Sequence, residues 1–193
     1  MAGPPARRTF RPVNEADVLV RLKAGEQDAF ESIFKTYYAQ LVGVAENMLR
    51  ERAGAEDVVQ DVMVELWRRR ENLQVETSIR AYLFRAVRNR SLNQIRHQKV
   101  APTADPEVAD QVATPAADRD FETRELKALL RKAVDGLPER CREVFELSRV
   151  RGLPYAEIAN VMGISIKTVE AQMGKALRVL REELAAYLPQ ADV

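Results

Sequence analysis

Cysteine and histidine are almost absent from this sequence of 193 residues, which contains one cysteine, Cys141, and one histidine, His97. A single cysteine cannot form an internal disulfide bond, and a single histidine excludes most zinc sites. The carboxylates form no metal-ligand pattern, so we expect no metal and no other cofactor. The chain also lacks a glycine-rich phosphate loop and a nucleophile paired with a base, so we do not expect an enzyme.

Long apolar runs and an excess of charge are missing as well. No run reaches the length of a membrane span, and the N-terminus MAGPPARRTF has basic residues without a following apolar segment. We therefore expect no membrane insertion, no signal peptide and a cytoplasmic protein. The net charge is +1, so any affinity for nucleic acid must come from local clusters of charge. Leu, Ala, Glu and Arg dominate, which favours helices.

The stretch LPYAEIANVMGISIKTVEAQMGKALRVLREEL at 153–184 has the pattern of a helix-turn-helix. Gly163 is suited to ending the first helix, Ile164 is an apolar plug, and Ser165 is a good N-cap for the second helix. The exposed stripe expected for the second helix combines small and cationic residues: Lys167, Ala171, Gly174, Lys175 and Arg178. This pattern favours a helix in the major groove of DNA. A helical hairpin with a solvated charged face is the simpler alternative.

Apolar residues at helical spacing predict four helices in the first hundred residues, at about 15–24, 27–50, 55–70 and 78–98, and two more between 121 and this stretch. Gly54 is expected to interrupt the helical pattern before the helix at 55–70. The second helix is rich in aromatic residues, and at this spacing they are more typical of a core than of a platform for stacking bases.

The third predicted helix carries an acidic row, Asp57, Asp61 and Glu65, at a spacing where like charges repel each other. Gln60 and Trp67 lie beside it. An uncompensated acidic row next to apolar side chains is typical of a docking surface for a basic protein partner. A solvated face, with Trp67 folded into the core, explains the spacing equally well.

The fourth predicted helix is basic along its whole length. Between Ser78 and Lys99 there are six basic residues and no acidic one: Arg80, Arg85, Arg88, Arg90, Arg96 and Lys99. Such segregation in a nearly neutral protein favours a site for nucleic-acid phosphates over a solvated face.

The composition changes at 100–120, which is rich in Ala and Pro and carries five acidic residues against one arginine. We interpret this stretch as a flexible acidic linker. The sequence then predicts an all-α protein with two small helical domains, at 14–99 and 121–188, the second containing the helix-turn-helix. A disordered N-terminus at 1–13 and a short tail at 189–193 complete the predicted organisation.

Four stretches resemble bacterial RNA polymerase sigma factors of the extracytoplasmic-function (ECF) type. They are AEDVVQDVMVELWRRR at 55–70, SIRAYLFRAVRNRSLN at 78–93, LPERCREVFELSRVRGLPYAEIANVMGISIKTVE at 137–170 and GKALRVLR at 174–181. The resemblance covers nearly all of 14–188, in the order and spacing of the family. It implies a protein that binds core RNA polymerase and directs promoter recognition, melting and transcription initiation.

The resemblance also implies which residues do this work, with 14–99 similar to sigma region 2 and 121–188 similar to sigma region 4. The residues implied in binding core RNA polymerase are Asp57, Gln60, Asp61, Glu65 and Trp67. Those implied at the −10 element of promoter DNA are Asn72, Arg80, Arg85, Arg88 and Asn89. Those implied at the −35 element are Ser165, Lys167, Thr168, Glu170, Ala171, Gln172, Lys175 and Arg178. An anti-sigma factor is a further partner that the family implies.

Two departures from the family concern the helix implied at the −35 element. Glu170 stands where many members have a second basic residue, and Gly174 stands where many have a bulkier one. The −35 sequence therefore cannot be carried over from the family.

Other classes of protein explain less of the chain. A response-regulator or one-component transcription factor can contain a similar ISIKTVE stretch without binding polymerase as a sigma subunit. That alternative leaves the acidic row and the basic helix unexplained, and no phosphoacceptor or ligand-binding domain is indicated upstream. A helical adaptor that binds only proteins would leave both basic helices without a purpose.

Overall fold

The computed structural model describes residues 15–100 and 121–185, and every regular element in these two ranges is helical. The all-α fold predicted from the sequence is confirmed. The predicted N-terminal extension and tail lie outside the described residues, as does the predicted linker apart from Val100. The chain divides between Arg96 and His97 into two compact units. Within 15–100 and 121–185, no helix has the length and apolar character needed to cross a bilayer.

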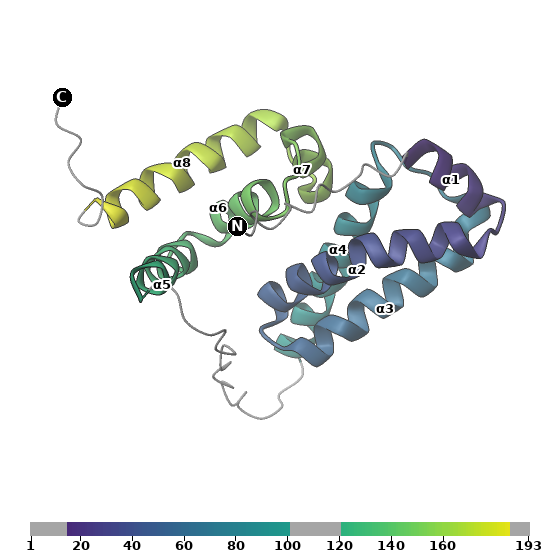
Figure 1. Cartoon of the computed structure of the whole chain (residues 1–193), viewed down its shortest axis with the longest axis horizontal. Helices are drawn as coiled ribbons and strands as arrows, with labels where there is room; N and C mark the ends of the chain where they lie inside the picture. The colour runs from purple at the N-terminus through teal and green to yellow at the C-terminus, as the bar shows by residue number, and fades with distance from the viewer. Residues whose placement is uncertain (1–14, 101–120, 186–193) are drawn as a thin grey trace, which may run out of the picture. The chain divides into compact units, whose positions relative to one another are not determined.

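Two long helices packed side by side form the centre of the N-terminal unit (Figure 1). Its elements are α1 (Glu15–Lys23), α2 (Gln27–Leu49), α3 (Arg52–Arg69), the single 3-10 turn η1 (Arg70–Asn72) and α4 (Ile79–Val100). The central pair is α2 and α3, while α1 contacts both α2 and η1.

One face of α3 is almost completely buried, as its apolar spacing predicts. The buried side chains of this face are Val58, Val59, Val62, Met63 and Leu66. Leu41 of α2 and Leu83 and Phe84 of α4 are also fully buried in this unit. Burying one Val or Leu side chain contributes roughly 1.5–3 kcal/mol, so this face fixes the rotation of α3 about its own axis.

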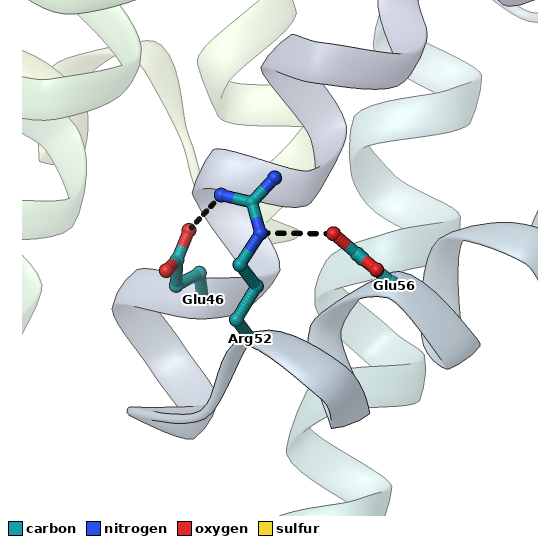
Figure 2. A network of polar contacts seen from close by, with 3 residues as sticks. All are labelled: Glu46, Arg52 and Glu56. Carbon is teal, nitrogen blue, oxygen red and sulfur yellow. Dashed lines mark hydrogen bonds and ion pairs between the residues drawn. The ribbon is translucent and has the colours of Figure 1, made fainter. Parts of the chain in front are cut away.

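The turn between α2 and α3 is short and is held by backbone and side-chain contacts. Arg50 ends α2 in the left-handed conformation, with φ of 61°, and its N–H donates to the carbonyl of Glu46 at 2.8 Å. Arg52 then lies between two carboxylates, with Nη1 at 3.7 Å from Glu46 and Nε at 2.9 Å from Glu56 (Figure 2). Because Arg52 is largely exposed, each pair contributes at most about 1 kcal/mol.

Gly54 does not interrupt the helical pattern, contrary to the prediction, and instead lies buried in the first turn of α3. A β-carbon at this position would meet Nε2 of Gln94 at 3.1 Å and Oε2 of Glu51 at 3.2 Å. The glycine therefore allows close packing between the start of α3 and α4. Periodicity and glycine content alone could not distinguish this role from that of a helix breaker.

The C-terminal unit is organised along its longest helix, α8. Its elements are α5 (Phe121–Asp135), α6 (Glu139–Phe145), the π-helical turn η2 (Glu146–Val150), α7 (Tyr155–Met162) and α8 (Ile166–Leu184). Helix α8 contacts α5, α6 and α7. Ala133 of α5, Cys141 of α6 and Ala176 of α8 form part of one buried cluster.

The turn between α7 and α8 has the geometry of the predicted helix-turn-helix. Gly163 ends α7 with φ of 66°, and the N–H of Ile164 donates to the carbonyl of Ala159 at 3.0 Å. Ser165 is the N-cap of α8. Leu177 of α8 is apolar but remains 39% exposed.

The packing around Gly54 generates a test of the fold. We expect Gly54→Leu to destabilise the N-terminal unit by about 1–3 kcal/mol, because the larger side chain must displace its neighbours. Gly54→Ala should change stability by less than about 1 kcal/mol, since the two closest atoms are side-chain ends that can move. Urea unfolding followed by circular dichroism measures both.

The matched control is Gly174→Leu, because a β-carbon at Gly174 of α8 would have nothing within 4 Å. This control should cause no loss of stability. Equal unfolding of Gly54→Leu and wild type would contradict the close packing at the start of α3.

Candidate functional site

The acidic row of α3 lies on the surface, opposite the buried face of the helix. Asp57, Gln60 and Asp61 are exposed, and Glu65 is half-buried. Val64 lies among them with 51% of its surface exposed. The row therefore combines carboxylates with an exposed apolar side chain, as the sequence predicts.

The acidic row is not uncompensated, which corrects the prediction. Oδ2 of Asp61 lies 3.4 Å from Nη2 of Arg90 on α4, and Glu65 forms an ion pair with Arg69 one turn further along α3. The side chains of Asp61 and Arg90 are 64% and 45% exposed, so water screens their attraction. These pairs lower the repulsion within the row and leave the carboxylates accessible.

Trp67 is half-buried and is enclosed by two side chains. Its ring lies 5.3 Å from the ring of Phe30 on α2, with the ring planes at 62°. The guanidinium of Arg70 lies over the indole at 4.5 Å from its centroid. The exposure of Trp67 is thus intermediate between the two alternatives that the sequence left open, an exposed docking residue and a core residue.

The basic residues of α4 do not share one face. Arg90 is directed towards Asp61 of α3, and Arg85 lies about 140° away from it around the helix. Tyr82 also lies near α3. Burial raises the pKa of its phenol, the charge of Arg69 opposes the rise, and Glu65 adds to it. The cluster of cations inferred from the sequence is therefore divided between a side near α3 and a side that includes Arg85.

The predicted −10 residues have different surroundings. Asn72, Arg85 and Asn89 are exposed, whereas Arg80 and Arg88 are half-buried. The guanidinium of Arg80 lies 5.9 Å from the centroid of the Phe84 ring, so part of its side chain packs on the domain. Arg85, Arg88 and Asn89 share one side of α4, and Arg80 lies about 140° away from Arg85.

The segment between η1 and α4 is tied to α4 at its C-terminal end. Oε2 of Glu76 lies 3.5 Å from Nη1 of Arg85, and Oγ of Ser78 accepts a hydrogen bond of 3.0 Å from the N–H of Ala81. The Ser78 bond satisfies a free N–H in the first turn of α4. Asn72 lies at the other end of the segment, in η1.

Helix α8 begins with a polar cap that involves two of the predicted −35 residues. Oγ of Ser165 accepts a hydrogen bond of 3.1 Å from the N–H of Thr168, and the two side-chain hydroxyls lie 2.8 Å apart. These two contacts stabilise the first turn at the N-terminal end of the helix. Such an end is suited to approaching phosphates or base edges.

The outer stripe of α8 is exposed along its length, as the sequence predicts. The exposed residues are Lys167, Glu170, Ala171, Gly174, Lys175 and Arg178. Gly174 has open space around its missing β-carbon, so packing within the described unit does not require a glycine there.

Gln172 differs from the other predicted −35 residues because its amide is engaged inside the unit. Its Oε1 accepts a hydrogen bond of 3.0 Å from the Sγ of Cys141, which is buried on α6. Cys141 and Gln172 are 31 residues apart, and helical spacing carried no signal of their contact. The sequence also missed Arg90 and Arg70 as the residues that organise the surroundings of Asp61 and Trp67.

Both units match models of the same protein family. The Sigma-70 region 2 model matches residues 33–100, and the Sigma-70 region 4 model matches residues 127–180. The order of the two matches is that of the two units along the chain, and the second match contains the helix-turn-helix. The class of protein is thus a helical transcription initiation factor of the sigma-70 kind.

Similar proteins of known class cover almost the whole chain. The RNA polymerase sigma factor CarQ of Myxococcus xanthus is 31% identical over 166 residues, covering 85% of this chain and 94% of CarQ. The ECF sigma factor SigK of Mycobacterium ulcerans is 27% identical, covering 96% of this chain and all of SigK. This chain belongs to the RNA polymerase sigma factors, and within them to the ECF type.

A solved structure has the same fold. The structure of CnrH in complex with the cytosolic domain of CnrY superposes with a TM-score of 0.64 at 24% sequence identity, covering 89% of this chain and 97% of CnrH. The family assignment favours a sigma subunit that binds core RNA polymerase over a response-regulator type of transcription factor.

The cap of α8 provides a test of the site's construction. Ser165→Ala should destabilise the C-terminal unit by about 1 kcal/mol, because the N–H of Thr168 loses its acceptor. Ser165→Asp should keep most of the stability, since aspartate is also a good N-cap and suits the positive end of the helix dipole. Thermal unfolding of the three proteins measures this order, and equal stability of Ser165→Ala and wild type would contradict it.

Proposed function

We propose that the two units of this ECF sigma factor carry out different steps of initiation. Residues 14–99 act as region 2, which docks on core RNA polymerase and opens the −10 element. Residues 121–188 act as region 4, which binds the −35 element. The proposal is supported chiefly by the position of the acidic row of α3 and the cationic stripe of α8, each exposed on a helix whose opposite face is buried.

The docking surface on core polymerase consists in this proposal of Asp57, Gln60, Asp61 and Glu65. Their surroundings favour exchange of partners, because the ion pair of Asp61 is exposed, that of Glu65 is partly exposed, and such pairs are worth at most about 1 kcal/mol each. A basic polymerase surface can replace Arg90 and Arg69 at little cost. The exposed Val64 adds apolar contact area at the centre of the row. Trp67 was predicted to belong to this surface, but its enclosure by Phe30 and Arg70 suits it to a different role.

Charge reversal tests the docking surface. We expect Asp57→Lys combined with Asp61→Lys to weaken binding to core polymerase by about tenfold or more, because like charges across an interface are strongly unfavourable. Co-purification of tagged sigma factor with core polymerase, followed by titration, measures the loss. Far-UV circular dichroism should remain unchanged, since both side chains are exposed.

The matched control reverses two other exposed acidic residues, Asp28 and Glu31 on α2. It makes the same change in net charge outside the acidic row and should retain binding within about twofold. If both double variants bind core polymerase equally well, the acidic row is not the docking surface.

The −10 element is proposed to lie along the side of α4 that carries Arg85, Arg88 and Asn89, next to Asn72 in η1. This side is suited to holding the backbone of a melted strand, because cations and polar side chains alternate along it. Arg80 would act at a distance from it, at the start of α4, where its side chain packs near Phe84.

The −35 element is proposed to contact the outer stripe of α8. Lys167, Lys175 and Arg178 are placed to bind phosphates, with Glu170 and Ala171 near base edges. Ser165 and Thr168 support this end of the helix through their cap. Gln172 contributes to −35 binding indirectly, because its amide oxygen accepts a hydrogen bond from Cys141 inside the unit.

Gly174→Ala separates the needs of folding from those of DNA binding. The substitution should stabilise the C-terminal unit by about 0.5–1 kcal/mol, because alanine favours the helix and has open space. It should nevertheless weaken binding to −35 DNA severalfold if the helix backbone approaches the duplex closely there.

Lys175→Gln tests a phosphate contact instead. It should weaken binding to all DNA sequences alike and lower the slope of log affinity against log salt concentration by about one.

Urea unfolding and binding titrations at several salt concentrations, with DNA selected from a randomised −35 library, measure both effects. If Gly174→Ala binds this DNA as tightly as wild type, the glycine is not at the DNA surface.

An anti-sigma factor is a further proposed partner. CnrH was solved with the cytosolic domain of CnrY, and the sigma factor RpoE was solved with the anti-sigma factor NepR from Bartonella quintana. The exposed acidic row and cationic stripe of this chain offer surfaces that such an inhibitor could cover. Because a sigma factor acts with the polymerase on the chromosome, we place the protein in the cytoplasm.

A further inference from the structure

Trp67 and Arg70 form a compact stack where α3 passes into η1. The guanidinium of Arg70 lies 4.5 Å from the centroid of the indole, and its Nη1 donates a hydrogen bond of 2.8 Å to the carbonyl of Trp67 itself. Phe30 of α2 meets the indole at 5.3 Å in an edge-to-face arrangement. The stack therefore joins α2 to the end of α3 through aromatic and cation–π contacts.

Arg70 is held by elements on more than one side. On one side it lies against the turn between α1 and α2, since a β-carbon built on Gly25 of that turn would be 3.5 Å from Nε of Arg70. Nη2 of Arg70 lies 3.3 Å from Oε1 of Glu71. Only 25% of the Arg70 side chain is exposed, in contrast to 73% for Arg69. Its charge is thus turned into the domain rather than towards a phosphate backbone.

The stack lies at the start of the segment from Leu73 to Ser78. The N–H of Leu73 donates to the carbonyl of Arg70 at 3.4 Å, and the Leu73 side chain is buried. At the other end, Ser78 caps α4 and Glu76 pairs with Arg85. Gln74 and Thr77 between these anchors are exposed. The segment is therefore held at both ends with its middle facing solvent.

We propose that Arg70 is a positioning residue, which through its stack on Trp67 sets the path of Leu73–Ser78 against the −10 element. This inference rests on the proposed role of the N-terminal unit at the −10 element. It assigns Trp67 to the support of this segment rather than to polymerase docking. The segment follows Asn72 and is tied to Arg85 by an ion pair, and both of these residues are proposed to contact the −10 element. A displacement of the segment by about 1 Å is sufficient to impair recognition severely, so its anchor controls function without contacting DNA.

Lysine cannot replace arginine in this role. The stack needs a flat cation that covers the indole while its separate N–H groups reach the carbonyl of Trp67 and the carboxylate of Glu71. A lysine ammonium keeps the charge but has neither the plane nor the fork of donors. Arg70→Lys therefore separates positioning from simple charge, and Arg69→Lys is the matched control because Arg69 is exposed and paired with Glu65.

The first measurement is spectroscopic and requires no DNA. Trp67 is the sole tryptophan of the chain, so tryptophan emission, excited selectively over the five tyrosines, reports on this stack. Arg70→Lys should shift the emission to the red and increase quenching by acrylamide, while far-UV circular dichroism stays the same. Arg69→Lys should leave both signals as in wild type. If emission and quenching are unchanged in Arg70→Lys, Arg70 does not hold Trp67 in the proposed way.

The second measurement uses full-length protein with core polymerase and a promoter selected by the wild-type holoenzyme. Arg70→Lys should reduce open complexes, detected by permanganate reactivity, by about tenfold. It should also relax the base preference selected at −10, with the −35 preference and the affinity for core polymerase unchanged. Arg69→Lys should remain within about twofold of wild type.

The outcomes separate this inference from the function on which it depends. If Arg70→Lys opens the promoter and selects the −10 element as Arg69→Lys does, the positioning role is wrong. A loss of core binding parallel to the loss of opening would also overturn it, because the stack would then serve docking. If the wild-type holoenzyme selects no promoter, the proposed function of the N-terminal unit fails instead.

Discussion

Burial of one face of α3 is the constraint on which the N-terminal unit depends. Val58, Val59, Val62, Met63 and Leu66 are all nearly inaccessible, so rotating the helix would expose several apolar side chains at a cost of several kcal/mol. With the inner face fixed, Asp57 and Asp61 must lie outside, and Trp67 must lie where α3 meets Phe30 of α2. The surface chemistry of this unit thus follows from its core.

The C-terminal unit applies the same constraint to α8. Val169, Met173, Ala176 and Leu180 are buried against the shorter helices, which turns Lys167, Lys175 and Arg178 outward. Because α8 is much longer than α7, its outer stripe extends well beyond the turn at Gly163. The turn fixes where α8 begins, and the buried stripe fixes which side chains a DNA duplex would meet.

Helical periodicity predicted most of the fold, because each helix has one apolar stripe and few interruptions. It placed the helix-turn-helix, its glycine and its N-cap correctly, since these depend on neighbouring residues alone. It failed where a residue's role depends on contacts distant in sequence. A small residue is needed at position 54 because Gln94 of α4 lies too close for a larger side chain there. Gln172 is directed inward because its amide oxygen accepts a hydrogen bond from Cys141 of α6. Neither contact leaves a trace in the local spacing of residues.

Charge shows the same division between local pattern and tertiary contact. Counting cations identified α4 as basic, but the count could not show that Arg90 turns to Asp61 while Arg85 lies on another side. The chain has 30 Lys and Arg residues against 29 Asp and Glu residues, so its net charge of +1 is compatible with separate acidic and basic surfaces. Because the ion pairs of Asp61 and Glu65 are at least partly exposed, each costs at most about 1 kcal/mol to break. A protein that docks on the acidic row therefore replaces Arg90 and Arg69 as counter-charges rather than meeting bare carboxylates, which favours a partner whose cations are arranged to match.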